Sequence, residues 1–180
     1  MIKYFVFISF MLLLFSSCSQ ISLQEIVKES KIPKSELVML IDKSDYTLSV
    51  LHQDKKLITY PCVFGFDPVN DKAREGDGCT PEGTFKIRSM YAHKSWSYFI
   101  WIDYPNASSW EKFKQRKASG KIPKNATIGG EVGIHGVPEG RDDLIKSKTN
   151  WTLGCISLKN KDITDLFKSI GNTTIMKIQP

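Results

Sequence analysis

Val132-Gly-Ile-His-Gly136 and Thr152-Leu-Gly-Cys-Ile-Ser-Leu158 are two short apolar segments interrupted by glycine. Both predict short strands, and the small residues beside His135 allow another backbone to come close. If the two strands are neighbours, His135 and Cys155 lie within hydrogen-bond reach. A thiol beside an imidazole is the arrangement of a cysteine nucleophile, because histidine stabilises the thiolate and later protonates the leaving group. The alternative is a core cysteine and an unrelated histidine.

Around these segments, the chain from residue 36 onward predicts a mainly β fold. Apolar and β-branched runs alternate with turn residues, and Asp42-Lys-Ser-Asp45 predicts a hairpin. A glycine-rich stretch over residues 65–83 predicts a long loop, which in a compact domain is often functional. The expected strands are residues 37–41, 47–51, 57–64, 84–90, 97–104, 132–136, 154–158 and 175–178.

Three short helices are expected. The first follows the capping-box spacing of Ser22 and Glu25 and ends before Pro33. The second follows Ser108-Ser109 and stops at Gly120. The third carries apolar residues at helical spacing from Ile163 to Ile170, with Asn160 as its cap. The predicted fold class is therefore mainly β with a few short helices, in one domain.

The start of the chain predicts export. From Tyr4 to Phe15, 11 of 12 residues are apolar, which fits a signal-peptide core and is too short for a membrane span. The following Phe15-Ser-Ser-Cys18 resembles a bacterial lipobox. The resemblance implies a signal peptide over residues 1–17 and a lipidated Cys18. The polar residues that follow predict a tether over residues 18–35, and its packing on the domain is left open. An ordinary signal peptide cut nearby is the alternative.

Composition limits the partners. The chain has 25 Lys and Arg against 19 Asp and Glu, a net charge of +6. The charges are spread without a like-charged run, so we expect no nucleic-acid partner, whereas a mildly basic surface suits a polyanionic wall or an anionic membrane. No zinc spacing or phosphate-binding loop occurs, and no metal or cofactor is expected. Cys62 and Cys79 are either free buried thiols or a disulfide.

The two opening segments resemble the L,D-transpeptidase (YkuD-type) catalytic domain. His135 is followed by 16 residues and then by Thr152-Leu-Gly-Cys-Ile-Ser157, where the family motif has Ser/Thr-His-Gly-Cys, an apolar residue, and Asn or Arg. Leu153 and Ser157 depart from that motif. The segment Arg74–Phe85 resembles the family's Gly-Asp-x-x-Thr-Pro-x-Gly-x-Phe segment. Asp103-Tyr-Pro-Asn106 and Asn150-Trp-Thr152 resemble a murein-modifying subgroup in which the second motif histidine is often absent.

The resemblance implies a β-sandwich or barrel over residues 36–180 and a role for each motif position. Cys155 is the expected nucleophile and His135 the general base and acid. The backbone carbonyl of Gly136 would orient the imidazole, and backbone N–H groups at Gly154 and Cys155 would form the oxyanion hole. Thr152, Trp151 and Arg141 are expected to contact the substrate. The implied partners are peptidoglycan stem peptides, in the periplasm or cell envelope of a bacterium; the oligomeric state is left open.

Two alternatives to transfer remain at this point. Water could resolve the thioester in place of an amine, which would make the chain an L,D-carboxypeptidase, or an amidase that releases a wall-attached lipoprotein. The departures at Leu153 and Ser157 also leave open a wall-binding lipoprotein without catalysis. The aromatic segment 96–104 and the loop 138–148 are further candidates for the substrate groove, with core packing and a solvated loop as the alternatives.

Overall fold

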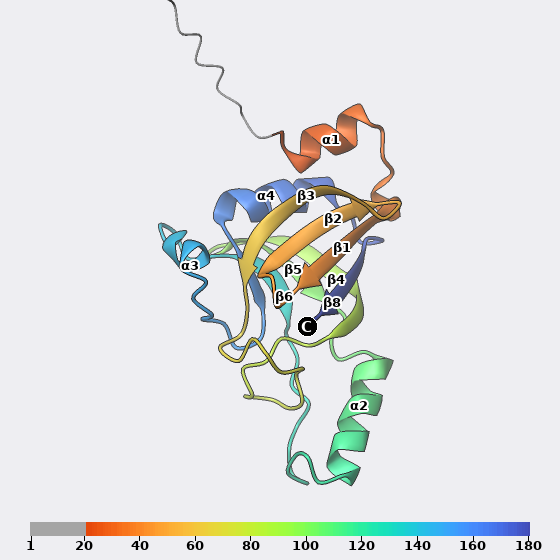
Figure 1. Ribbon diagram of the computed structural model, residues 1–180, viewed down its shortest axis with the longest axis vertical. Coiled ribbons are helices and arrows are strands. Elements are labelled where there is room, and N and C mark those ends of the chain that lie inside the picture. The colour runs from red at the N-terminus through yellow and green to blue at the C-terminus, as the bar shows by residue number, and fades with distance from the viewer. Residues whose placement is uncertain (1–20) are drawn as a thin grey trace, which may run out of the picture.

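A closed eight-stranded barrel forms the body of the molecule (Figure 1). The structure, a computed structural model, describes residues 21–180, so the expected signal peptide and Cys18 lie outside the described residues. The strand order around the barrel is β1-β2-β3-β7-β6-β5-β4-β8. The strands are β1 (Leu37–Asp42), β2 (Thr47–His52), β3 (Lys55–Val63), β4 (Gly83–His93), β5 (Ser97–Ile102), β6 (Gly133–Gly136), β7 (Ile156–Leu158) and β8 (Ile175–Gln179).

Each strand predicted from the sequence is present, and the barrel fold is confirmed. β1 and β2 form the expected hairpin, in which the Asp42 carboxylate accepts the Asp45 N–H at 3.0 Å. Two neighbouring pairs are parallel, β1 with β8 and β6 with β7, and the remaining pairs are antiparallel. Parallel pairs need long connections. The 19 residues between β6 and β7 therefore leave room for a structured loop.

Four α-helices are present among residues 21–180: α1 (Leu23–Glu29), α2 (Ala107–Ala118), α3 (Asp143–Lys146) and α4 (Asn160–Ser169). α1 has the predicted capping box. α2 begins three residues earlier than expected, because the Asn106 side chain caps it by accepting the Ser109 N–H at 3.0 Å. The single turn α3 lies in the loop 138–148 and was not predicted, since four residues are too few to show helical periodicity.

The prediction that Asn160 caps the last helix is wrong. Asn160 is the first helical residue of α4, and Lys159 precedes it without a side-chain cap. The Asn160 Oδ1 instead accepts a hydrogen bond from the Ser97 hydroxyl at 2.8 Å. A side chain on Gly136 would collide with this amide. The side-chain amide of Asn160 thus joins α4 to the start of β5 and lies next to Gly136 of β6.

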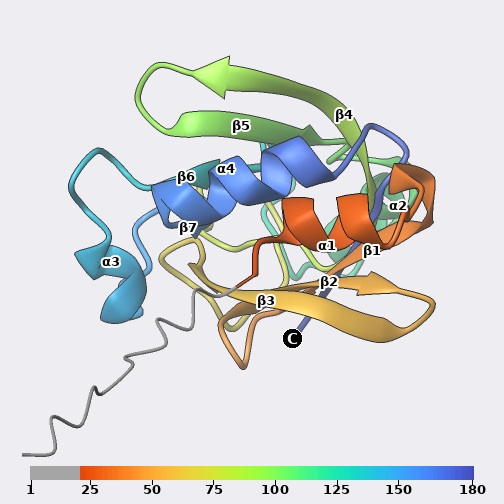
Figure 2. The same cartoon turned by 90° about the horizontal axis from the view of Figure 1, so that it is seen from above.

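α1 is part of the folded body, so the described part of the predicted tether is packed on the domain, as the sequence interpretation left open. Figure 2 shows α1 beside α4, across one opening of the barrel. Leu23 is fully buried. The Asp165 carboxylate of α4 accepts the backbone N–H groups of Leu23 and Gln24 at 2.9 and 3.0 Å. These bonds satisfy two amides that a helix N-terminus leaves unpaired.

The barrel interior holds the main core. In β1 the side chains of Leu37, Met39 and Ile41 alternate inward and are fully buried. Ile134 of β6 and Ile156 of β7 are fully buried beside one another in register. The residues on each side of these two therefore lie on the opposite face of the sheet. Among residues 21–180, no helix combines the length and apolar character needed to cross a bilayer.

Candidate active site

His135 lies on β6, and Cys155 directly precedes the neighbouring strand β7. β6 and β7 pair in parallel with His135 opposite Ser157, so the strand adjacency assumed from the sequence is observed. Both residues line one cleft of about 790 Å³. The other walls are Lys72, Glu75 and Gly76 from the loop 65–83, residues 129–132, residues 151–154, and Trp96. The structure thus brings a thiol and an imidazole to one solvent-filled hollow.

The His135 ring is fixed by its own strand. Its exposed fraction is 2%, and its Nδ1 lies 2.8 Å from the carbonyl oxygen of Gly136. A carbonyl only accepts, so Nδ1 carries the proton and Nε2 is the free acceptor. The pKa of His135 is lowered to about 4, chiefly by burial. The bond to Gly136 acts to raise this pKa, and the charge of His93 acts to lower it. The ring is therefore neutral near pH 7 and can accept a proton at Nε2.

Aromatic rings surround the imidazole. Trp96 stacks on His135 with ring centroids 4.4 Å apart, and Phe99 lies parallel to it at 5.8 Å. Trp151 meets the ring edge-on at 5.5 Å. His93 stacks in turn on Trp96 at 4.4 Å. This packing removes water from the ring, and the removal of water is the main cause of the lowered pKa of His135. The same packing restricts the rotation of the ring.

Cys155 is the only described cysteine that lines the cleft. Burial raises the pKa of its thiol to about 11, while a hydrogen bond from the Gly133 N–H and the charge of Lys72 act to lower it. The sulfur lies 3.6 Å from the Glu131 carbonyl oxygen, to which the thiol donates. Thiol and imidazole are thus both neutral at rest, and an ion pair must form when the sulfur reacts.

Thr152 holds the turn before Cys155. Its hydroxyl donates to the Cys155 carbonyl at 2.7 Å and accepts the Gly154 N–H at 3.2 Å. The Gly154 N–H is therefore not free as an oxyanion donor in this structure, in contrast to the prediction. The Cys155 N–H has no partner among the described residues and is the donor that remains. Gly154 itself has φ +137°, and a Cβ there would lie 2.7 Å from the Cys79 carbonyl, so only glycine fits.

Comparison with known families identifies this arrangement. The model of the YkuD family, the L,D-transpeptidase catalytic domain, matches residues 36–178. The chain belongs to this family. A search of curated protein sequences found no match.

Solved structures show the same fold. The helical cell shape determining protein Pgp2 (K307A mutant) of Campylobacter jejuni has a TM-score of 0.58 and 22% identity, over 87% of this chain and 55% of that chain. Bd1075 of Bdellovibrio bacteriovorus has a TM-score of 0.57 and 21% identity, over 80% and 48%. The Enterococcus faecium L,D-transpeptidase C442S mutant has a TM-score of 0.52 and 15% identity, over 80% and 50%. This L,D-transpeptidase domain thus spans about half the length of these relatives.

Of the residues predicted to contact the substrate, Trp151 lies in the cleft and Arg141 lies outside it. Trp151 lines the cleft of the L,D-transpeptidase domain, and its buried indole N–H has no partner among the described residues. Arg141 does not line the cleft. It lies before α3, and its exposed guanidinium bonds the Asp143 carboxylate at 2.9 and 3.1 Å. Arg141 and Asp143 are two residues apart, so the local ion pair satisfies the side chain without a distant partner.

Three charged residues of the cleft were not assigned roles from the sequence: Lys72, Glu75 and Glu131. Lys72 and Glu75 lie in or beside a segment that carries the family resemblance, but nothing in their spacing shows that they face Cys155. Leu153, at the position of the second motif histidine, is 77% exposed at the cleft. Within residues 21–180, no three His, Cys, Asp or Glu side chains gather in a way that could hold a metal ion.

The disulfide alternative for Cys62 and Cys79 is not observed. Both are free and buried in the structure. Burial raises the pKa of both thiols, so both are neutral near pH 7. Cys155 is the cysteine that combines access to the cleft with a histidine on the neighbouring strand.

Proposed function

We propose that this L,D-transpeptidase domain transfers acyl groups between peptidoglycan stem peptides through a thioester on Cys155. The observation that carries the proposal is the pair of parallel strands that places Cys155 and His135 at one cleft, with the imidazole held by the Gly136 carbonyl. A nucleophile, a base and a group that orients the base are the parts that covalent catalysis by a thiol requires. Family membership supports the substrate class.

The proposed reaction has two steps. In the first, the Cys155 sulfur attacks the carbonyl carbon of a diaminopimelate or similar residue in a tetrapeptide stem, while its proton passes to Nε2 of His135. The C–N bond breaks, the proton moves from Nε2 to the departing amine of D-alanine, and a thioester remains. The negative charge on the carbonyl oxygen would be stabilised by the free Cys155 N–H. In the second step, an amine of a neighbouring stem attacks the thioester and restores the thiol.

The experiment is incubation of the purified protein with sacculi, followed by separation and mass spectrometry of the released muropeptides. We expect new dimers linked between the third residues of two stems, with loss of D-alanine. Cys155→Ala and His135→Ala should each lower product formation by about three orders of magnitude or more, since both members of the pair are required. The variant Arg141→Ala, which removes an exposed side chain outside the cleft, serves as a control and should retain activity.

Other outcomes select the alternatives. Shortened stems or released lipoprotein without any new dimer would show that water resolves the thioester, and the chain would then be a hydrolase. Absence of product, together with no adduct between Cys155 and a thiol-reactive substrate mimic, would leave a wall-binding protein. If Cys155 forms the adduct in the parent protein and the adduct is lost in His135→Ala, the wall-binding protein without catalysis is excluded.

We also propose that the protein is exported and held on a bacterial membrane by a lipid on Cys18. The support is the sequence of residues 1–18, with its apolar stretch and the resemblance of Phe15-Ser-Ser-Cys18 to a lipobox. Several acyl chains on one residue, at about 0.8 kcal/mol per buried CH₂, would hold the chain firmly on the membrane. Cys18→Ser should move the protein from the membrane to the soluble periplasmic fraction; unchanged membrane association would contradict lipidation at this cysteine.

A further inference from the structure

Lys72 is a buried cation in the wall of the cleft. It lies in the loop 65–83 and its side chain is 4% exposed. Its ammonium donates to the Asp77 carboxylate at 2.9 Å and to the Arg74 carbonyl at 3.2 Å. An ammonium has three N–H donors. Among the described residues the third has no partner, and a buried charge is kept only where it has a favourable interaction.

The ammonium lies against the turn that carries the nucleophile. A Cβ placed on Gly154 would be 3.8 Å from Lys72 Nζ, an ordinary van der Waals contact, so the ammonium lies beside the residue before Cys155. Gly154 must be glycine in this place, because the Cys79 carbonyl closes the other side. The space that a Gly154 side chain would occupy is thus bounded by the Cys79 carbonyl and the Lys72 ammonium.

The charges of the Lys72–Asp77 pair act on two cysteines, Cys79 and Cys155. Asp77 accepts the Cys79 N–H at 3.0 Å. Burial chiefly raises the pKa of the Cys79 thiol, the negative charge of Asp77 raises it further, and Lys72 acts to lower it. Cys155 experiences the charges of Lys72 and Glu131, which act in opposite directions. Glu75 also lines the cleft, but its carboxylate is bound by the Thr127 hydroxyl, and His135 is neutral at rest. Among the described residues that line the cleft with Cys155, Lys72 is therefore the one that is cationic at rest.

We propose that Lys72 is a positioning residue whose ammonium, held by Asp77 against the Gly154–Cys155 turn, stabilises negative charge on the Cys155 sulfur. The inference rests on the proposed function, in which Cys155 is the nucleophile. Burial of the thiol opposes formation of the thiolate, so a fixed cation nearby offsets part of that penalty.

The test is the pH dependence of Cys155 alkylation by iodoacetamide in the full chain, with the modified residue quantified by peptide mass spectrometry. Lys72→Gln keeps a hydrogen-bond donor for Asp77 and removes the charge. We expect its alkylation rate to be about tenfold lower between about pH 7 and 9, which corresponds to a pKa of Cys155 raised by about one unit. Lys72→Arg keeps the charge and should stay within about threefold of the parent rate.

Lys43→Gln is the matched control. Lys43 is equally buried, and it bonds Glu82 at 2.6 Å and the loop carbonyls of Val69 and Asn70, away from the cleft. A purely structural role would make Lys43→Gln and Lys72→Gln behave alike. An equal rate loss in both variants, or an unchanged profile in Lys72→Gln, overturns the proposal. If Lys72→Gln does not fold, the double variant Lys72→Met/Asp77→Asn removes both charges and supports the same comparison.

Alkylation needs no wall substrate, so this result is separate from the muropeptide experiment. A charge-dependent profile together with an absence of peptide products would refute the transferase and retain the role of Lys72. Formation of peptide products together with an unchanged profile in Lys72→Gln would retain the transferase and refute the role of Lys72.

Discussion

At the scale of single residues, the site depends on a neutral thiol and a neutral imidazole rather than on a preformed ion pair. The pKa of Cys155 is raised to about 11 and that of His135 lowered to about 4, in both cases chiefly by burial. The aromatic rings of Trp96 and Phe99 exclude water from the imidazole, and the Gly136 carbonyl keeps Nε2 free. Proton transfer between the two groups is therefore expected to occur only when a substrate carbonyl takes up the developing charge.

The buried imidazole makes stability depend on pH. The fold favours neutral His135, so as the pH falls from 6.5 to about 4 the unfolded chain is protonated and the folded chain is not. The contribution of His135 to the free energy of unfolding is complete above pH 6.5. It falls by about 3 kcal/mol as the pH falls from 6.5 to about 4. His135→Gln should flatten the pH dependence of the free energy of unfolding, measured by urea denaturation. Identical curves for parent and His135→Gln would contradict this cause.

Thr152 is expected to affect catalysis by shaping the turn. Thr152→Val keeps the shape of the side chain and removes the hydroxyl that bonds both Gly154 and Cys155. Loss of two buried hydrogen bonds should cost about 1–3 kcal/mol of stability. We expect kcat on stem peptides to fall about tenfold or more with a smaller change in KM, because the nucleophile is displaced. Thr152→Ser restores the hydroxyl and should recover most of the rate; a KM effect alone would indicate direct substrate binding instead.

At the scale of elements, α1 illustrates how a short amphipathic segment is added to the family domain. The family match begins at residue 36, yet α1 is anchored by buried Leu23 and by Asp165 of α4. Asp165 also accepts the Tyr60 hydroxyl at 2.7 Å, so one carboxylate joins α1, β3 and α4. A seven-residue helix is not stable alone in water. Its order depends on this docking.

Leu23→Ala should therefore undock α1. Truncation of a fully buried leucine costs about 2–5 kcal/mol. We expect the free energy of unfolding to fall by up to this amount and the amides of α1 to lose protection in hydrogen exchange. Gln24→Ala, which alters an exposed side chain of the same helix, should change stability by about 0.5 kcal/mol or less. Full protection of α1 in Leu23→Ala would show that Asp165 alone holds the helix.

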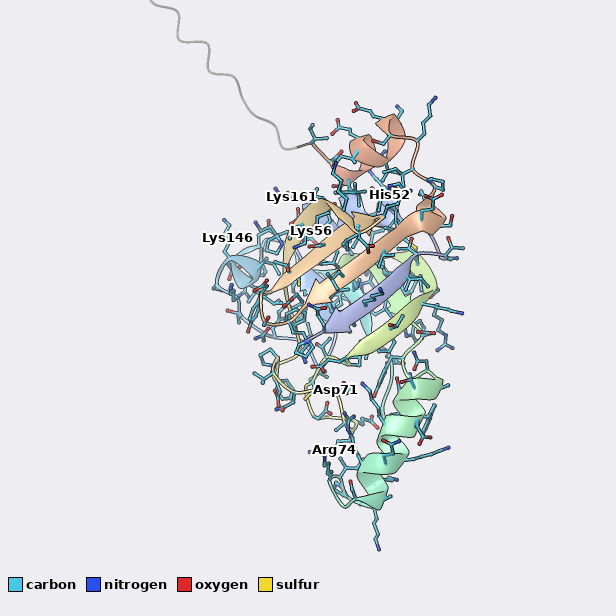
Figure 3. All side chains as sticks on the ribbon, turned by 45° about the vertical axis from the view of Figure 1, so that its right-hand side comes forward. His52, Lys56, Asp71, Arg74, Lys146 and Lys161 are labelled. Atoms are coloured by element: carbon cyan, nitrogen blue, oxygen red, sulfur yellow. The ribbon has the colours of Figure 1, made fainter. Side chains whose placement is uncertain are left out.

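At the scale of the whole molecule, the wall of the cleft is braced by a distant helix. Asp71 of the loop 65–83 accepts bonds from Lys112 and Arg116 of α2 at 3.0 and 2.7 Å, and Figure 3 shows Asp71 beside α2. Arg116 also donates to the Lys72 carbonyl at 2.6 Å. The segment that holds Lys72 is thus fixed from one side by Asp77 and from the other by α2.

Removing the brace should loosen the cleft. In Arg116→Ala we expect the amides of residues 72–77 to exchange about tenfold faster, since a lost charge-assisted bond is worth about 1–3 kcal/mol locally. KM for stem peptides should rise by a similar factor. The control Lys114→Ala changes an exposed lysine of the same helix and should leave both unchanged. Unaltered exchange in Arg116→Ala would show that Asp77 is sufficient to order the loop.

The amino-acid sequence by itself determined the β strands, the barrel class, and His135 with Cys155, since two-residue periodicity, glycine spacing and a motif are local properties. Only the tertiary structure decided which charges face the thiol: Lys72 approaches Gly154 across 82 positions of sequence, and no local pattern encodes such a distance. The same holds for Leu23 beside Asp165, for the use of Asn160 by Ser97 rather than as a cap, and for the position of Arg141 outside the cleft. Burial and long-range contacts arise when the barrel closes, and these set the pKa values and the free donors of the site.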